Sequence, residues 1–133
     1  MRRNVTDRIL LKEIYDTYLQ TFCDFDEESK SRSNKIYVPI DCEAIAKKLG
    51  LDIDIVFGRL YYHLDRKHGY TDDQGAQTHL FSMRVGGDHH VIHFPLLSAV
   101  LADLELAHHR FTLPLMLSLI ALSMSVFNFV TGL

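Results

Sequence analysis

The pattern of hydrophobic and polar positions in this chain changes near residue 110. Before that point, apolar residues recur at spacings that place them on one face of a helix or strand, with charged residues between them. Residues 111–133 contain no Lys, Arg, Asp or Glu. We therefore expect a polar domain over residues 1–110 and a different kind of element over residues 111–133.

The apolar segment has the length of a membrane span. A helix over residues 112–132, at about 1.5 Å per residue, is roughly 31 Å long, which matches the bilayer's hydrocarbon thickness of about 30 Å. A core helix of a soluble oligomer is the alternative, but such helices usually keep a polar edge. The segment therefore predicts one C-terminal transmembrane helix in contact with membrane lipid.

Three residues before this segment suit a membrane interface. His108, His109 and Arg110 precede it directly, and we expect them to act as an anchor at the headgroups. Because Arg110 is the nearest permanent charge, the positive-inside bias favours a cytoplasmic N-terminus. The expected topology is a single-pass, tail-anchored protein of a bacterial inner (cytoplasmic) membrane.

Small and polar residues within the span lie on one side of the predicted helix. They follow steps of three, four, three and four, and they are Ser118, Ala121, Ser125, Asn128 and Gly132. Small side chains let membrane helices approach closely, and interhelical hydrogen bonds from Ser or Asn contribute about 0.6 to 2 kcal/mol each. This stripe predicts a homo-oligomer formed through the span, and chance clustering of serines is the alternative.

The polar domain shows helical signals followed by strand signals. A first helix is expected within residues 4–25, with Thr6 as its cap, followed by an exposed connection at 26–35 and a short extended run at 36–40. A second helix is expected from Asp41 to Gly50, and a third from its cap Asp52 to Gly69.

Two glycines then indicate a β-hairpin. Gly86 and Gly87 separate residues 78–85 from 88–94, and a two-residue glycine loop supplies the positive φ angles of tight hairpin turns. This loop pairs Phe81 with Ile92 and Met83 with His90, so the apolar side chains should share one face. A fourth helix is expected over 95–110.

These elements resemble the winged helix-turn-helix superfamily. The residues that carry the resemblance are Ile45, Ala46, Leu49, Gly50 and Leu51, followed by Val56, Leu60 and Leu64. The stretch "LDRKHGY" is similar to the usual end of the third helix, and the hairpin is similar to the wing. The resemblance covers residues 7 to about 110 and implies an α+β, mostly α, winged helix domain, here followed by the span.

Winged helices serve as DNA readers and as protein-docking modules. In DNA-binding members the start of the third helix enters the major groove, where this chain has Asp52, Ile53 and Asp54. Carboxylates oppose docking on a backbone that carries one negative charge per roughly 1.7 Å. We therefore expect a protein partner, with DNA binding as the disfavoured alternative.

The candidate partner or nucleic-acid face consists of Asp52 and Asp54 at the start of the third helix, together with basic and aromatic residues on the expected solvent side. Arg59, Tyr62 and Arg66 recur at helical spacing on the third helix. The wing adds Arg84, and Lys47 and Lys48 offer further phosphate contacts.

The remaining residues predict neither catalysis nor a cofactor. The net charge is -3, and Cys23 and Cys42 lie outside any CxxC spacing, which favours a reducing cytoplasm. His89 and His93 would stand about 13 Å apart on a strand, too far to share a zinc ion. The chain has no glycine-rich phosphate loop and no GxSxG motif. We expect a non-enzyme that binds no metal.

Two functions suit this organisation. In the first, the domain is a sensor or adaptor and the spans associate laterally, by analogy with small membrane effectors of bacterial stress or defence systems. In the second, the protein is a membrane-tethered DNA-binding transcriptional regulator.

Overall fold

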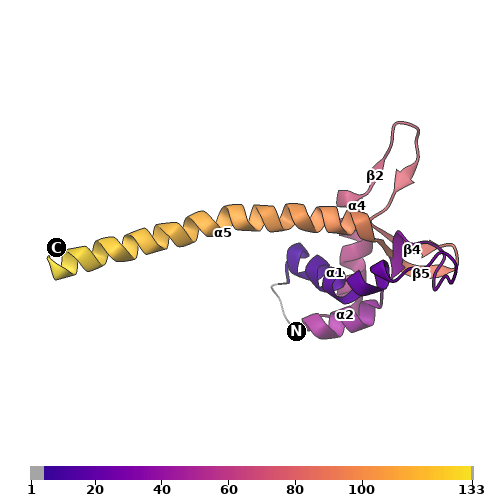
Figure 1. Ribbon diagram of the computed structural model, residues 1–133, viewed down its shortest axis with the longest axis horizontal. Coiled ribbons are helices and arrows are strands. Elements are labelled where there is room, and N and C mark those ends of the chain that lie inside the picture. Colours follow the sequence, from indigo (N-terminus) through magenta and orange to yellow (C-terminus); the bar gives the residue numbers. More distant parts are fainter. Residues whose placement is uncertain (1–4, 133) are drawn as a thin grey trace. The chain divides into compact units, whose positions relative to one another are not determined.

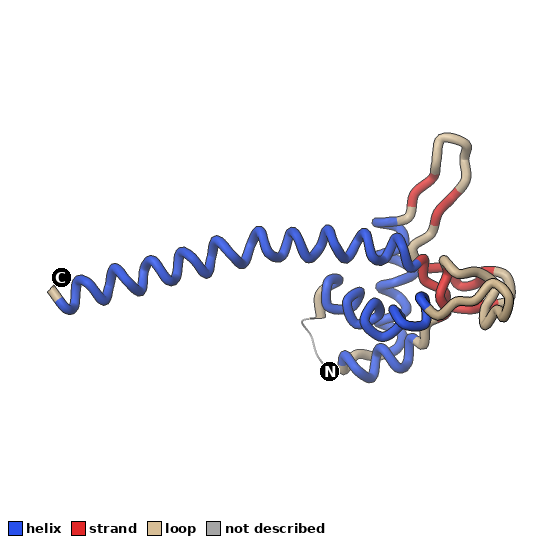
Figure 2. Tube along the Cα trace, viewed as in Figure 1, coloured by secondary structure: helices blue, strands red, loops and turns tan. Residues whose placement is uncertain are grey.

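The computed structural model describes residues 5–132, which separate into two units, 5–101 and 102–132. The first unit is a mostly helical α+β structure with a small sheet, and the second is the continuation of one long apolar helix (Figures 1 and 2). The elements in chain order are α1 (Asp7–Cys23), β1 (Tyr37–Pro39), α2 (Cys42–Leu49), α3 (Ile53–Gly58), η1 (Arg59–Leu64), α4 (Asp65–His68), β2 (Tyr70–Thr71), β3 (Gln77–Thr78), β4 (Phe81–Val85), β5 (Asp88–His93) and α5 (Phe94–Thr131).

The first three predicted helices begin at the caps that the sequence predicts. The Thr6 hydroxyl accepts a hydrogen bond from Ile9 N, and Asp41 and Asp52 cap α2 and α3 in the same way. Gly50 ends α2 with φ 67°, in the left-handed region that favours glycine. These starts and stops are therefore confirmed.

The third predicted helix corresponds to α3, η1 and α4 in succession, and is called the third helix below. Its middle part, η1, is a π-helical turn, which the sequence did not predict. Over η1 the hydrogen bonds span five residues, so that Asp65 N donates to Leu60 O. Such turns are rare and occur frequently at functional sites. Leu60 and Leu64 within this turn are both buried.

A three-stranded antiparallel sheet has the order β1-β5-β4. The predicted register of Phe81 opposite Ile92 is confirmed, whereas no ladder pair forms between Met83 and His90. His90 has φ 51°, a conformation that interrupts a regular strand. Met83 is 48% exposed, so the apolar face does not extend to it. The short hairpin of β2 and β3 was not predicted (Figure 1).

The sequence predicts that the whole connection at residues 26–35 is exposed, but the structure buries one residue of it. Arg32 is only 6% exposed. Its guanidinium donates to the carbonyl oxygens of Thr21 at 3.1 Å and Lys35 at 2.9 Å, and lies over the Phe25 ring. The last carbonyls of a helix lack intrahelical partners. Arg32 satisfies such a group at the end of α1, which explains its burial.

The core joins α1, the third helix, the sheet and the start of α5. Its largest fully buried side chains include Leu10, Ile14, Leu60, Phe81 and Leu97. The Phe94 ring stacks between those of Tyr15 and Phe22, with ring centroids 5.3 and 4.8 Å apart. Phe94, the first residue of α5, therefore packs against α1.

A fourth helix and a separate span were expected, but the structure has one continuous helix, α5. Pro114 lies inside it, where its missing N–H leaves the carbonyl of Arg110 without the usual partner. The helix ends at Thr131 rather than at Gly132, which follows with φ 72°. Its large apolar side chains from Leu106 to Val130 are exposed, and the helix is long and apolar enough to span a membrane.

Candidate docking groove

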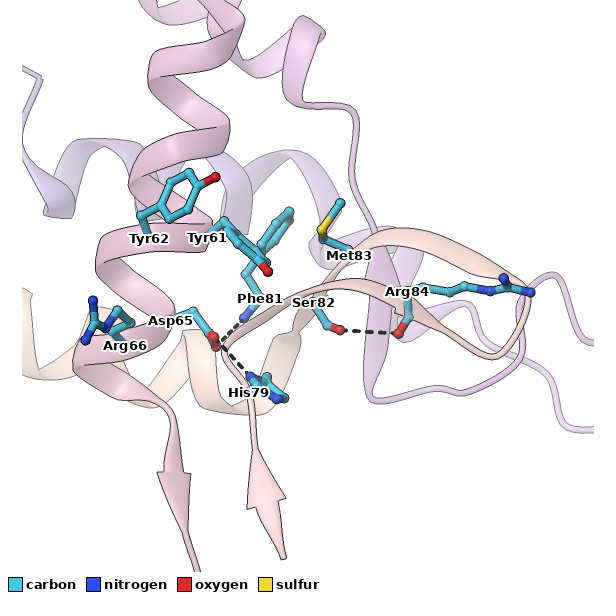
Figure 3. Close-up of a pocket in the computed structure, with 9 residues that line it drawn as sticks. All are labelled: Tyr61, Tyr62, Asp65, Arg66, His79, Phe81, Ser82, Met83 and Arg84. Carbon is cyan, nitrogen blue, oxygen red and sulfur yellow. Dashed lines mark hydrogen bonds and ion pairs between the residues drawn. The ribbon is translucent and has the colours of Figure 1, made fainter.

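An open groove of about 610 Å³ lies between the third helix and β4 (Figure 3). The helix contributes aromatic and charged side chains, and the strand contributes a run of consecutive residues. The groove is lined by Tyr61, Tyr62, Asp65, Arg66, His79, Phe81, Ser82, Met83 and Arg84.

The groove follows the edge of β4 rather than one of its faces. Ser82, Met83 and Arg84 are consecutive, and consecutive side chains on a strand point to opposite faces. All three line the same groove, which is possible only where both faces are reached from the edge of the strand.

Asp65 joins the third helix to the start of β4. Its Oδ1 accepts hydrogen bonds from Leu80 N at 2.8 Å and Phe81 N at 3.3 Å, and its Oδ2 lies 3.0 Å from His79 Nδ1. The Asp65 side chain is 13% exposed. Its carboxylate is therefore engaged inside the protein and has little capacity left for a ligand.

Three of the residues predicted for the partner face meet in this groove: Tyr62, Arg66 and Arg84. Tyr62 is 67% exposed and contacts the neighbouring Tyr61 ring edge to face. Arg84 donates from Nε to Gly86 O at 2.9 Å. Within residues 5–132, neither Arg66 nor Arg84 has an ion pair. The groove consequently offers two guanidinium groups beside an exposed aromatic ring.

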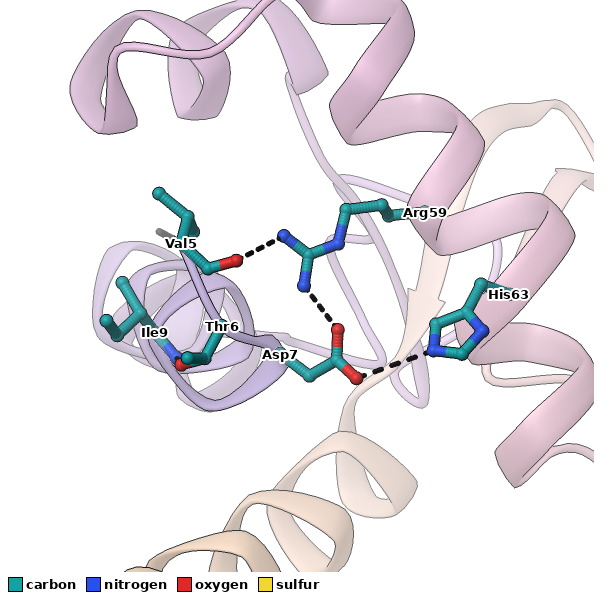
Figure 4. A network of polar contacts seen from close by, with 6 residues as sticks. All are labelled: Val5, Thr6, Asp7, Ile9, Arg59 and His63. Carbon is teal, nitrogen blue, oxygen red and sulfur yellow. Dashed lines mark hydrogen bonds and ion pairs between the residues drawn. The ribbon is translucent and has the colours of Figure 1, made fainter. Parts of the chain in front are cut away.

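Arg59 does not belong to the groove. It is half-buried, donates to Val5 O at 2.6 Å and pairs with Asp7, which also lies 3.5 Å from His63 Nε2 (Figure 4). Burial by itself raises the pKa of Asp7, but the hydrogen bond and charge of Arg59, with His63 and Lys67, outweigh it and lower the pKa. Arg59 thus fastens η1 to the start of α1.

Asp52 and Asp54 lie at the start of α3, outside the groove. Asp52 Oδ1 accepts a hydrogen bond from Asp54 N at 2.8 Å, the contact of a helix cap. Ile53 and Ile55 beside them are 43% and 47% exposed. The helix start therefore presents carboxylates and apolar side chains rather than hydrogen-bond donors. In α2, Lys47 pairs with Glu43, and Lys48 with Glu13 of α1.

The hairpin turn is held by the connection that precedes β1. Ser33 N donates to Asp88 Oδ2 at 2.8 Å, and Gly87 N donates to Ser33 Oγ at 3.4 Å. Gly86 has φ 60°, and a Cβ there would lie 2.8 Å from Ser33 Oγ. The turn is thus anchored, and residue 86 needs glycine for both conformation and space.

Chemistry-bearing residues elsewhere in the domain are few. Among the described residues, no group of three or more His, Cys, Asp or Glu side chains is placed to hold a metal ion. Burial raises the pKa of the Cys42 thiol to about 11, and the neighbouring Asp41 charge adds to the shift. This thiol is therefore protonated at neutral pH.

The predicted association stripe is exposed on α5. In residues 5–132 the side chains of Ser118, Ser125 and Asn128 make no hydrogen bond. By contrast, hydroxyls off the stripe donate to carbonyls four residues earlier: Thr112 to His108, Ser123 to Leu119 and Thr131 to Phe127. Ala121 lies within the stripe, whereas Gly132 lies past the end of the helix. His108, His109 and Arg110 are exposed on the same helix, before the uncharged segment.

Comparison with protein-family models, with curated proteins and with solved structures finds no match to this chain.

Proposed function

We propose that this protein is anchored in a membrane by α5 and that its winged helix domain docks a protein partner. The observation that carries the proposal is the groove beside β4, which contains exposed Tyr62 together with Arg66 and Arg84, neither of which has an ion pair within residues 5–132. A groove that combines cations with an aromatic surface suits a partner segment that carries both carboxylates and apolar side chains.

The order of elements supports a winged helix. One helix is followed by a strand, two helices, the short β2–β3 hairpin and the β4–β5 hairpin, and the early strand β1 pairs with β5. In this assignment β4 and β5 form the wing, and the groove lies between the wing and the third helix.

Protein docking is favoured over DNA binding by the charges around the third helix. Its first turn exposes Asp52, Ile53 and Asp54, none of which is a usual donor to base edges. Arg59 is engaged with Asp7, and both lysines of α2 have glutamate partners whose charges oppose a phosphate backbone. The unpaired Arg66 and Arg84 are the observation that favours the alternative, a membrane-tethered DNA-binding regulator.

The membrane part of the proposal depends on α5. Its uncharged, exposed segment supports anchoring in the inner membrane, with the docking domain in the cytoplasm and His108, His109 and Arg110 at the headgroups. The free side chains of Ser118, Ser125 and Asn128 support lateral association of spans. Partner binding would then act on the clustering of spans, as in an adaptor or a small membrane effector.

A selection of random DNA duplexes with the full chain in neutral-lipid nanodiscs tests this choice. We expect at most non-specific affinity, with a Kd of about 10⁻⁴ to 10⁻⁶ M at physiological salt. Enrichment of one sequence with nanomolar affinity, lost in Arg66→Gln and Arg84→Gln, would replace the docking proposal by the regulator.

A further inference from the structure

We propose that the free edge of β4 receives an extended acidic segment of the partner protein as an added β-strand. Arg66 and Arg84 would hold the carboxylates of that segment. This inference rests on the proposed docking function and specifies the chemistry and conformation of the partner.

Backbone directions show which groups of β4 face outward. β4 is the outer strand of the order β1-β5-β4. His93 N donates to Leu80 O at 2.8 Å, so residue 80 faces β5, while His90 O accepts from Ile40 N on the β1 side. Because these directions alternate along an antiparallel ladder, the N–H and C=O groups of Met83 point away from β5, into the groove.

The outward groups are free along the middle of the strand. Phe81 N is engaged with Asp65 Oδ1 at 3.3 Å, which closes the first position of the edge. Within residues 5–132, the backbone of Met83 has no hydrogen-bond partner. Proteins usually protect such edges with lysine, proline or a covering segment. β4, with the sequence FSMRV, has no proline, and its only charged residue, Arg84, is one that an acidic strand would neutralise, so its edge can pair with such a strand.

Charge determines what kind of strand fits. The two unpaired guanidinium groups of the groove are those of Arg66 and Arg84, whereas its carboxylate, Asp65, is already engaged. The exposed Tyr62 ring and Met83 side chain add apolar surface. An added strand with carboxylates and apolar residues would complement both features.

The two arginines approach the edge from different sides. Phe81 packs against Phe57 of α3 with ring centroids 5.8 Å apart, so the face of β4 that carries Phe81 and Met83 is the helix side. Arg66 belongs to the helix, whereas Arg84 extends from the opposite face of the strand (Figure 3). Since side chains alternate along an added strand, adjacent acidic residues would reach one arginine each.

Binding of a defined peptide to the full chain in neutral-lipid nanodiscs tests the proposal. The probe is an extended peptide of alternating Val and Thr with Glu-Asp at its centre, and the control peptide has Gln-Asn instead. We expect Arg66→Gln and Arg84→Gln each to weaken binding of the acidic probe by about tenfold. Lys30→Gln, which removes an exposed cation outside the groove, should leave binding unchanged.

Two substitutions of Met83 test the backbone hydrogen bonds of the proposed added strand. Met83→Pro removes the outward N–H without removing a ladder bond to β5, and should weaken binding at least tenfold, whereas Met83→Leu should bind like the parent. Hydrogen exchange in the unmodified protein gives an independent readout, because the Met83 amide should become protected when the peptide binds.

The outcomes separate the two proposals. If the arginine variants weaken binding but Met83→Pro does not and the Met83 amide stays unprotected, the added strand is contradicted while docking in the groove stands. If the acidic peptide fails to bind at about 1 mM, both are contradicted. Equal binding of a single-stranded oligonucleotide, unaffected by Met83→Pro, would assign the groove to nucleic acid instead.

Discussion

Asp65 Oδ1 accepts a hydrogen bond from the backbone N–H of Leu80 at 2.8 Å. This contact holds the end of the third helix against the first residues of the hairpin and so sets the width of the groove between them. The proposed docking surface therefore depends on a partly buried carboxylate that does not itself touch the partner.

Asp65→Ala should destabilise the domain by about 2 to 3 kcal/mol, because it leaves the amides of Leu80 and Phe81 without an acceptor. Thermal unfolding in detergent, followed by near-ultraviolet circular dichroism, measures this effect, since all six tyrosines precede the apolar segment. Asp73→Ala, at an exposed position of the β2–β3 hairpin, is the matched control and should change stability by under about 0.5 kcal/mol. Equal stability of the two variants would show that Asp65 does not hold β4.

His93 makes the start of α5 sensitive to pH. Its Nδ1 accepts from Leu96 N at 3.0 Å, so the ring caps the helix only while that nitrogen is unprotonated. Burial lowers the pKa of His93, an effect that its own backbone hydrogen bond partly opposes. The stabilising contribution is therefore present above the unfolded-state pKa of about 6.5 and is lost as the pH falls through the lower folded-state pKa.

Unfolding measured between about pH 7.5 and pH 5 tests this cap, with the range set by the histidine pKa. The parent should lose stability towards pH 5 more steeply than His93→Asn, which keeps an acceptor at the cap but does not titrate. His93→Ala should lose about 1 kcal/mol at pH 7.5. Identical pH slopes for the parent and His93→Asn would assign the acid sensitivity to other histidines.

Local signals in the sequence predict most of the fold. Each helix cap, Thr6, Asp41 or Asp52, accepts a hydrogen bond from a backbone N–H two or three residues later. The turn at Gly86 sets the register of Phe81 against Ile92. These interactions join residues close in sequence, so a pattern can reveal them. The continuity of α5 was missed because the change in composition near residue 110 suggested a boundary.

The interactions between distant residues could not be predicted in this way. Arg59 meets Asp7 from 52 positions away, and the spacing that placed it with Tyr62 and Arg66 gave no sign of that pair. Arg32 lies in a segment without apolar residues, and only the three-dimensional course of the chain brings it to the end of α1. Of the predicted face, the structure therefore brings together Tyr62, Arg66 and Arg84. It leaves Asp52, Asp54 and Arg59 outside the groove.

The stripe on α5 predicts a difference between two sides of the span. Ala121→Ile and Ser125→Ile should weaken association because bulky side chains keep the helices apart, and Asn128→Leu should remove an interhelical hydrogen bond of about 0.6 to 2 kcal/mol. Leu119→Ile and Val130→Ile, on other sides, should leave association nearly unchanged. Crosslinking in membranes compares the five variants. Equal effects on both sides would mean that the span anchors the protein without assembling it.

Anchoring by the uncharged segment is the claim on which the proposed function depends most. Carbonate extraction of membranes from cells that express the full chain, beside a chain truncated after Arg110, measures it directly. The full chain should stay in the membrane pellet at alkaline pH, because residues 111–133 match the hydrocarbon thickness and carry no charge. The truncated chain should be released. Recovery of the full chain in the soluble fraction without detergent would contradict the membrane anchor.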